Sequence, residues 1–362
     1  MITVAFITRA TLFTVPGGDT RQVTHTAAAL AAYGVTVDVL LTDQPISYER
    51  YELLHFFNIA RPADILYHVR RCSVPFVVSP IFVDYSEYDQ THRGGVAGLL
   101  FRILGADAIE YTKAVARWLA GRDRLMYKKY LANGHRRSVQ EIIRKCSLLL
   151  PNSASEYRRL VNAYGTEKPY IVITNGIDGD RFRYRGEDGR DPLLVLCVAR
   201  IEGIKNQLNL IRALNHTKYN LVLAGAAAPG QPGYFRACHE LAATNIFFMG
   251  QLSQEELVLY YKKATVHILP SWFETTGLSS LEAAAMGCRI VISDRGDAHE
   301  YFGEDAFYCD PSSPESILGA VEAAALAPVS DTLRKKIAVK HTWQEAARQT
   351  AGAYQSIMVK QA

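Results

Sequence analysis

Two glutamates eight positions apart, Glu274 and Glu282, lie in a stretch of the chain where carboxylates can do chemistry. The apolar run Val266–Leu269 predicts a buried parallel strand, and a loop that carries Glu274 follows it. Gly277 then opens a small, apolar helix that holds Glu282, where a carboxylate is costly unless a partner pairs with it. Because ligands of parallel α/β sheets bind at the carboxyl ends of the strands, both glutamates are predicted to face a binding crevice.

This stretch resembles the Glu-x7-Glu signature of retaining nucleotide-sugar glycosyltransferases, the glycogen-synthase-like family 4 with the GT-B fold. The resemblance implies that Glu274 contacts the hydroxyls of the donor sugar and Glu282 the ribose. It also implies that the backbone at Thr276, Gly277 and Leu278 faces the diphosphate. Physical chemistry agrees, because a helix N-terminus attracts anions and an ionised carboxylate accepts two hydroxyl donors. The alternative is a core helix with one stray glutamate and a surface loop with another.

Two cations follow the first strand of the second half of the chain. Arg200 and Lys205 resemble the family's Gly-Arg-x-x-x-x-Lys pattern, with Ala199 where glycine is common. The resemblance implies that both bind the diphosphate. Fixed cations lower the barrier to transfer, because the leaving diphosphate gains negative charge as the sugar bond breaks. The alternative is two surface cations in a loop.

Glycine-bearing turns complete the expected donor site. Gly17 and Gly18 precede a helix and match the family's N-terminal Gly-Gly loop, although an ordinary turn between strand and helix has the same sequence. Gly225, Met249 and Gly250 end two further strands and resemble the family's nucleotide pocket. They fit plain strands that end in turns equally well.

On the acceptor side the chain departs from the family, which usually has a histidine after the strand that Phe76–Ser79 predicts. Ile81 and Phe82 are nearest to that position. Asp84 or His55 can take its place, since either can hold or deprotonate an acceptor hydroxyl. The alternatives are a loop cap for Asp84 and a core histidine for His55.

Neither a metal nor another cofactor is expected. Asp178-Gly179-Asp180 has the Asp-x-Asp form of the metal motif in a different glycosyltransferase fold. Here it lies in a polar, glycine-rich stretch where Asp and Gly are ordinary turn residues. We therefore expect protein cations to serve the diphosphate.

Strands and helices alternate along most of the 362 residues, which predicts parallel sheets and two α/β domains. The resemblance implies two Rossmann-like domains facing across a cleft, the GT-B type. We expect an acceptor domain at 1–175, a hinge at 176–191, a donor domain at 192–340 and a last helix within 341–362 that packs on the first domain. The expected strands lie near Ile2–Thr8, Val35–Leu41, Leu53–Phe57, Phe76–Ser79, Ser147–Leu150, Tyr170–Thr174, Leu193–Ala199, Asn220–Ala224, Ile246–Met249, Thr265–Leu269, Arg289–Ser293 and Ala306–Cys309.

Composition indicates an ordinary soluble protein, with 49% hydrophobic and 21% charged residues. A net charge of +4 does not indicate a nucleic-acid partner. The chain starts directly with a strand rather than a signal peptide, and its six scattered cysteines lack a Cys-x-x-Cys pair. These features predict a cytoplasmic protein.

One segment is strongly basic. Residues 93–145 hold twelve Lys and Arg against four Asp and Glu, interleaved with apolar and aromatic residues. Such helices can lie on an anionic membrane surface, which predicts peripheral association with the inner face of the membrane and a lipid-linked acceptor. The alternatives are a solvated basic face and a groove for a phosphorylated or acidic glycan.

The resemblance implies a retaining, metal-independent transferase in polysaccharide biosynthesis. It would move a hexosyl or N-acetylhexosaminyl group from a nucleotide-diphospho-sugar to a hydroxyl of a glycan or lipid-linked saccharide. A nucleotide-sugar epimerase on the same fold and a non-catalytic nucleotide-sugar-binding protein remain alternatives. The missing Gly-x-Gly-x-x-Gly fingerprint disfavours a nicotinamide dehydrogenase.

Overall fold

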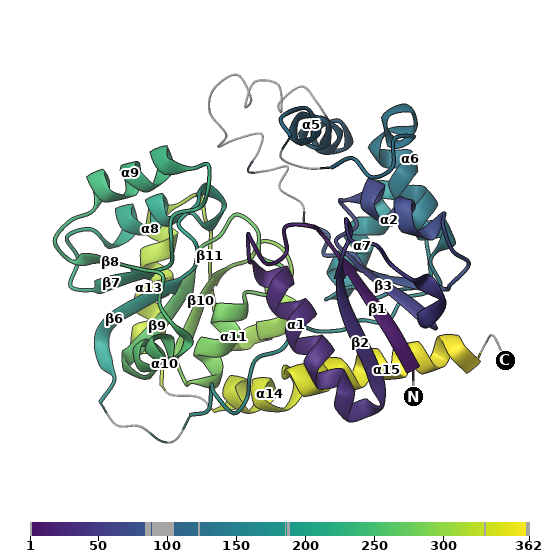
Figure 1. Ribbon diagram of the computed structural model, residues 1–362. Helices are drawn as coiled ribbons and strands as arrows, with labels where there is room; N and C mark the ends of the chain where they lie inside the picture. Colours follow the sequence, from purple (N-terminus) through teal and green to yellow (C-terminus); the bar gives the residue numbers. More distant parts are fainter. Residues whose placement is uncertain are drawn as a thin grey trace. The chain divides into compact units, whose positions relative to one another are not determined.

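The computed structural model describes residues 2–83, 88, 105–121, 124–184, 186, 189–328 and 331–359. The chain divides into two compact units, which we treat separately (Figure 1). The N-terminal unit comprises residues 1–175 and 343–362, and the C-terminal unit comprises residues 176–342. Among the described residues, no helix is both long and apolar enough to cross a lipid bilayer.

The N-terminal unit contains a parallel sheet with the strand order β2-β1-β3-β4-β5. Every residue of β3 is buried, as expected for a central strand covered on both faces. This order is that of doubly wound sheets in which the topological switch point lies between β1 and β3. The strands are β1 (Ile2–Thr8), β2 (Val35–Leu41), β3 (Leu53–Phe57), β4 (Phe76–Ser79) and β5 (Leu148–Leu149).

Six helices of the described chain belong to this unit, of which α5 packs against α6. The C-terminal helix α15 packs against α1, where the rings of His25 and Trp343 stack with their centroids 5.2 Å apart, and α2 packs against α6 (Figure 1). The helices are α1 (Gly18–Leu30), α2 (Pro62–Val69), α5 (Ala106–Leu119), α6 (Tyr130–Lys145), α7 (Ala154–Tyr164) and α15 (Trp343–Val359), with short 3-10 turns at Ala31–Tyr33 and Tyr48–Arg50.

One expected strand of this unit is wrong. The segment predicted as Tyr170–Thr174 forms an isolated bridge from Tyr170 to Leu149 instead of a strand. The N–H of Ile171 donates to Leu149 O at 3.0 Å, so the segment does run beside β5. β5 itself has only two residues, so it is too short to pair with the segment over more than this one bridge.

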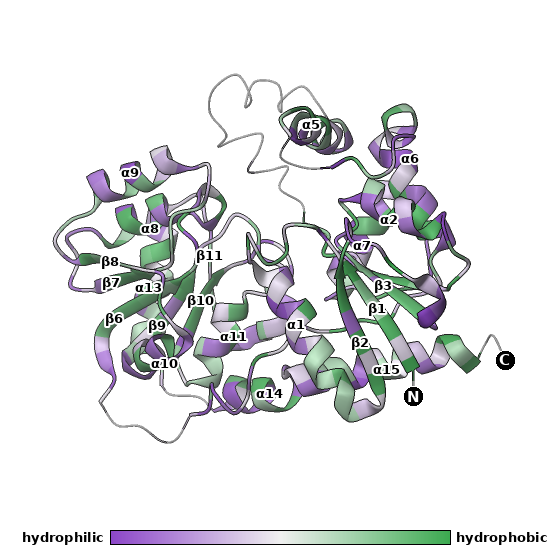
Figure 2. Ribbon diagram, viewed as in Figure 1, coloured by the Kyte–Doolittle hydropathy of each residue, from purple (hydrophilic) through white to green (hydrophobic). Residues whose placement is uncertain are grey.

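The C-terminal unit contains a six-stranded parallel sheet with the order β11-β10-β9-β6-β7-β8. Counted along this unit, that is the Rossmann order 3-2-1-4-5-6, whose switch point lies between β6 and β9. All of β9 is buried. In Figure 2 the strands are mostly hydrophobic, and the helices that flank them carry hydrophilic residues. The strands are β6 (Asp191–Val198), β7 (Asn220–Ala224), β8 (Ile246–Gly250), β9 (Ala264–Leu269), β10 (Arg289–Ser293) and β11 (Phe307–Cys309).

The helices of this unit follow the strands in alternation, as the sequence predicts. They are α8 (Gln207–Leu214), α9 (Pro232–Leu241), α10 (Gln254–Lys263), α11 (Leu278–Ala285), α12 (Ala298–Phe302), α13 (Pro314–Leu326) and α14 (Thr332–Lys340), with 3-10 turns at Gly203–Lys205 and Gly303–Asp305. A single large core joins the two faces of the sheet.

Candidate functional site

A cation and a carboxylate meet at the switch point of the C-terminal unit. Lys205, in the loop after β6, forms an ion pair through Nζ with Oε1 of Glu274, in the loop after β9. Ser271 Oγ donates a hydrogen bond to the same Oε1 at 2.7 Å. The Glu274 side chain is 7% exposed and that of Lys205 is 23% exposed. The two residues that the sequence assigned to the sugar and the diphosphate are therefore in direct contact.

The loop after β10 holds the backbone of Glu274 in place, and the loop after β6 is joined to the segment just before it. The N–H of Asp297, after β10, donates to Glu274 O at 2.8 Å, and Glu274 forms a bridge with Gly296. Gly296 has φ 86°, and a Cβ there would lie 2.1 Å from Glu274 O, so this close approach requires glycine. Trp272 N donates to Ile204 O at 2.9 Å, which joins the loop after β9 to the loop after β6.

Helix α11 begins where the sequence predicts, with Gly277 as its N-cap in the left-handed region at φ 65°. Its buried glutamate has the partner that burial demands, because Tyr261 on α10 donates to Glu282 Oε2 at 3.0 Å. Thr276 is buried just before the helix, with its Oγ1 3.4 Å from Tyr301 OH. The N-terminus of α11 therefore follows Glu274 directly, with its dipole directed at the carboxyl end of β9.

The remaining donor candidates lie at the ends of β6, β7 and β8. Arg200 is half-exposed and forms an ion pair with Glu202 at 3.3 Å. Gly225 has φ 154°, and a Cβ on it would lie 2.0 Å from Ala199 O, so glycine is required for packing there. Gly225 N donates to Gly250 O at 2.7 Å, and Met249 is 40% exposed beside it.

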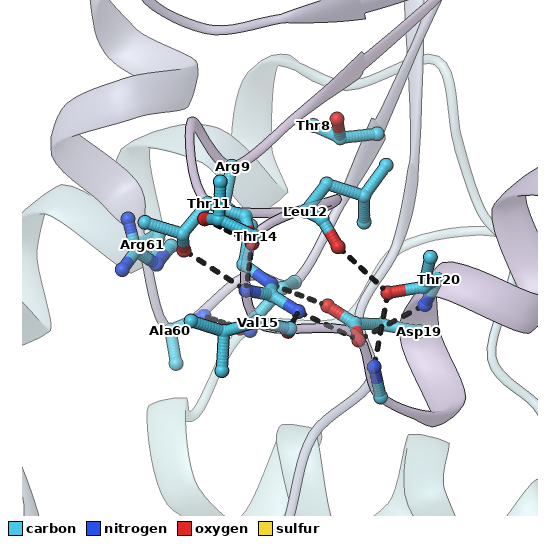
Figure 3. Close-up of polar contacts among 12 residues, drawn as sticks. Thr8, Arg9, Thr11, Leu12, Thr14, Val15, Asp19, Thr20, Ala60 and Arg61 are labelled. Carbon is cyan, nitrogen blue, oxygen red and sulfur yellow. Dashed lines mark hydrogen bonds and ion pairs between the residues drawn. The ribbon is translucent and has the colours of Figure 1, made fainter. Parts of the chain in front are cut away.

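In the N-terminal unit, the Gly17-Gly18 turn is organised by a residue that the sequence analysis missed. Arg9, directly after β1, bonds Asp19 Oδ2 at 2.6 Å and Val15 O at 2.8 Å (Figure 3). Gly17 caps α1, and its N–H donates to Thr20 Oγ1 at 3.0 Å. An arginine immediately after a strand was the available signal, since such positions face the ligand-binding edge of a sheet.

The acceptor candidates are less favourable. His55 is 2% exposed within β3, and its two ring nitrogens lie 2.7 Å from Tyr354 OH and 2.8 Å from Ser79 Oγ. Burial lowers the pKa of His55 to about 3. This placement favours the core-histidine alternative over a role at an acceptor hydroxyl. Asp84 lies outside the described residues.

The loop after β4, at which the family usually has a histidine, is held by a buried carboxylate. Ile81 adopts φ 46°, an uncommon conformation for a β-branched residue. The next N–H, that of Phe82, donates to Glu156 Oε1 at 2.7 Å. Glu156 is fully buried and its other oxygen accepts from Asn152 N at 2.6 Å. The buried carboxylate thus fixes a loop with local backbone strain.

The Asp-x-Asp stretch forms a turn. Asp178 Oδ1 accepts from the backbone N–H of Asp180 at 3.2 Å and of Arg181 at 3.1 Å. Among the residues that the structure describes, no group of three or more His, Cys, Asp or Glu is arranged to hold a metal ion.

Part of the basic segment lies outside the described residues, including Arg93, Arg102 and Arg122. Within the described part, Asp107 pairs with Arg136 at 3.1 Å and Glu110 with Lys113 at 2.8 Å. The exposed residues include the apolar Trp118, Leu119 and Leu131 and the basic Arg124, Lys128, Lys129, Arg137 and Arg144.

Comparison with known proteins relates the chain to glycosyltransferases. The family described as Glycosyl transferases group 1 matches residues 180–342. A glycogen synthase of Mycobacterium tuberculosis is 29% identical over 229 residues, 59% of this chain and 55% of that protein. A D-inositol 3-phosphate glycosyltransferase of Streptomyces avermitilis is 25% identical over 250 residues, 60% of this chain and 53% of that protein. The chain thus matches about half the length of these curated relatives.

Solved structures resemble almost the whole chain. Sucrose-phosphate synthase from Thermosynechococcus elongatus has a TM-score of 0.74 at 16% identity and covers 99% of this chain and 100% of its own. Anabaena HepE in complex with UDP and glucose has a TM-score of 0.69 at 15% identity, over 98% of this chain and 100% of its own. Residues 180–342 therefore match the glycosyl transferases group 1 family, and the chain shares the α/β fold, with two parallel sheets, of glycosyltransferases of the GT-B type.

Proposed function

We propose that this protein transfers a glycosyl group from a nucleotide-diphospho-sugar to a hydroxyl acceptor, with retention of anomeric configuration and without a metal ion. The observation that carries the proposal is the cluster of Lys205, Glu274 and Ser271 at the switch point between β6 and β9. A ligand with both hydroxyls and phosphates suits this cluster, since carboxylates accept from hydroxyls and ammonium groups donate to phosphates.

The two ends of the donor fit different parts of this cluster. Glu274 would receive the sugar hydroxyls, with Ser271 holding the carboxylate in one orientation. Lys205, Arg200 and the N-terminus of α11 would hold the diphosphate, where negative charge grows as the sugar leaves. Glu282, kept in place by Tyr261, would accept from the ribose hydroxyls.

The comparisons support a nucleotide-sugar donor without identifying it. HepE, which shares the fold, is described in complexes with UDP and with UDP-glucose. The matched relatives are named glycogen synthase and D-inositol 3-phosphate glycosyltransferase, and these names do not point to one common acceptor. We propose a hexose or an N-acetylhexosamine as the donor sugar, and neither the HepE complexes nor the names of the relatives select between them.

A nucleotide-sugar panel tests the proposal. A bound donor at about 100 times its dissociation constant should stabilise the protein by ~2.7 kcal/mol, which appears as a shift in thermal unfolding. The best donor is then incubated with hydroxyl acceptors, and the anomeric configuration of the product is read by NMR. Conversion of the nucleotide sugar without any acceptor would indicate an epimerase, and binding without turnover would indicate a binding protein.

Chelation tests the metal-free part of the proposal. Transfer should continue in EDTA, because Lys205 and Arg200 supply the positive charge at the diphosphate. Strict dependence on added magnesium or manganese would contradict it and would return attention to Asp178 and Asp180.

We further propose that the exposed basic and apolar residues of α5 and α6 bind an anionic membrane surface and bring the protein to a lipid-linked acceptor. The supporting observation is that Trp118 and Leu119 at the end of α5 and Leu131 at the start of α6 are exposed, as are Lys128 and Lys129 directly before α6. Cosedimentation with anionic vesicles at low and high salt tests this proposal.

A further inference from the structure

Two pockets in the N-terminal unit share Arg61 and Asp64 in their walls. The first, which we call the strand-end pocket, is lined by Thr8 and Arg9 at the end of β1 and by Phe57 at the end of β3. The second, which we call the arginine pocket, lies between the start of α2, the last turns of α5 and the start of α6. The shared residues make one continuous surface of the two.

The strand-end pocket has the position of a ligand site. In the order β2-β1-β3-β4-β5, the topological switch point lies between β1 and β3. Residues at the carboxyl ends of both strands line this pocket. Ligands of open α/β sheets bind at such a switch point, outside the carboxyl ends of the strands. The donor residues lie at the corresponding point of the other sheet, between β6 and β9.

The arginine pocket is basic. Arg61, Arg117 and Arg124 line it, against the single carboxylate of Asp64, which pairs with Arg61 at 3.3 Å. Two acids of α5, Asp107 and Glu110, form ion pairs with Arg136 and Lys113. A guanidinium has five donors in a planar fork, so an arginine can hold a protein partner and a ligand oxygen together.

The walls suit a small ligand with an anionic end. Trp118 is 38% exposed at the rim and Tyr130 is buried below it. Arg124 is exposed, so the pocket opens to solvent. Clustered guanidinium groups favour phosphate and carboxylate, which accept two parallel N–H donors from one arginine.

We propose that the arginine pocket binds the phosphate or carboxylate of an anionic sugar acceptor, while the rest of the acceptor extends over the ends of β1 and β3. The inference rests on the proposed function, because it names the class of acceptor that the transferase uses. A lipid headgroup phosphate shares this chemistry, and the experiment separates the two sources.

Trp118 provides a direct reporter. The other tryptophans, Trp272 and Trp343, are 4% and 5% exposed, so ligand at the rim should change the emission of Trp118. Titrations use a hexose 6-phosphate, a hexuronate, the neutral hexose and vesicles of anionic phospholipid. Trp118→Phe assigns the signal. Calorimetric titration of a nucleoside diphosphate into the same protein reports on the donor site separately.

At least one of the two anionic sugars should bind at least tenfold more tightly than the neutral hexose. Arg117→Gln and Arg124→Gln should each weaken that binding about tenfold or more, and Lys at these positions should restore part of it. Arg137→Gln, an exposed arginine of α6 outside the pocket, is the matched control. Nucleoside diphosphate affinity should not change in any of these variants.

Normal nucleoside diphosphate binding without a preference for anionic sugars would overturn this inference and leave the proposed function standing. So would an unchanged affinity in Arg124→Gln, a substitution at an exposed position. A response to vesicles but not to soluble anionic sugars would assign the pocket to a membrane surface instead. Failure to bind any nucleotide or nucleotide sugar would refute the proposed function, whatever the sugars do.

Discussion

Lys205 Nζ contacts Glu274 Oε1 across 69 positions of sequence, and the contact joins the loops that follow β6 and β9. The cation that we propose for the diphosphate and the carboxylate that we propose for the sugar hydroxyls thus form an ion pair at the switch point of the sheet. Each can release part of this contact to the donor, since a carboxylate accepts several donors and an ammonium group has three N–H bonds. In the proposed function, the pair would therefore set the boundary between the sugar and diphosphate ends of the donor site.

Glu274→Ala should remove most transfer activity and leave nucleoside diphosphate binding largely intact. The sugar loses an oriented acceptor, a loss of about 10²–10³ in kcat if the contact is made in the transition state. Transfer rates and calorimetric titration with the nucleoside diphosphate measure the two effects. Glu322→Ala, at an exposed position of α13, controls for a general effect of removing a carboxylate. Turnover like that of the native protein in Glu274→Ala would remove Glu274 from the mechanism.

Lys205→Ala and Arg200→Ala should both slow transfer by one to three orders of magnitude, about 3 kcal/mol for a lost stabilising group. They should differ in stability. Lys205→Ala leaves the nearly buried Glu274 without its cation and should cost about 1–3 kcal/mol. Arg200 is half-exposed, so its pair with Glu202 should contribute about 0–1 kcal/mol. Chemical denaturation compares the variants, and equal stabilities would show that the Lys205 contact is weak.

Tyr261→Phe should destabilise the C-terminal unit, because the carboxylate of Glu282 loses a buried donor. The cost should be about 1–3 kcal/mol, and a double-mutant cycle with Glu282→Ala should give a coupling energy of about 0.5–3 kcal/mol. Nucleoside diphosphate affinity should fall more in Glu282→Ala than in Tyr261→Phe, because Tyr261 acts through Glu282. Tyr260→Phe, the adjacent position on α10, is the control. Additive stabilities would mean that the hydrogen bond does not orient Glu282.

The sequence was sufficient to predict most strands and the helix after Glu274, because buried parallel strands and an apolar helix have strong local patterns. It also indicated that Glu282 needs a partner. It did not identify Tyr261, which is 21 positions away on another helix, because pairing between elements depends on how the sheet is ordered. The strand orders of the two sheets are likewise absent from any local pattern.

The remaining differences arise from tertiary packing. Tyr170–Thr174 has the composition of a strand, but β5 offers only two residues for it to pair with. His55 follows the pattern of a site residue, whereas Tyr354 from the end of the chain and Ser79 from the neighbouring strand engage its ring. Such partners lie far away in sequence, so the spacing of residues around His55 carries no signal of them.

Acid should destabilise the N-terminal unit through His55. Burial lowers its native pKa to about 3, while in the unfolded chain the pKa is about 6.5. Below pH 6.5 the unfolded state therefore takes up a proton that the native state does not, and stability falls as the pH falls toward 3. At pH 5 this one group costs about 2 kcal/mol.

His55→Gln should remove that part of the pH dependence. Urea denaturation at pH 7.5 and pH 5.0 measures it in the variant and the native protein. His68, whose pKa burial lowers to about 4, and His267, lowered to about 3, add slopes of the same sign that should persist in the variant. His216→Asn, at an exposed position, is the control. An identical change in stability between the two pH values for His55→Gln and the native protein would contradict the buried neutral ring.

Anionic vesicles should bind the protein at low salt and release it at high salt, if α5 and α6 carry the membrane surface. Each cation near such a surface contributes about 1 kcal/mol and is screened within a Debye length of about 10 Å at 0.1 M salt. Reversing Lys128, Lys129, Arg137 and Arg144 to Glu should therefore lower cosedimentation by more than about a hundredfold. Arg136 is left unchanged because it pairs with Asp107.

The matched control reverses four exposed cations of the C-terminal unit, so that the net charge changes equally. These are Arg212, Lys218, Arg236 and Lys263. Loss of binding in both variants would mean that vesicles respond to net charge rather than to this surface. Binding that persists when Lys128, Lys129, Arg137 and Arg144 are reversed would exclude this surface as the anchor. Binding that is lost in the variant with these four cations reversed, but kept in the control, would place the charge at the membrane. A further reduction of binding by Leu119→Ser in the native protein would place the exposed apolar residues there as well, because an interfacial helix needs both.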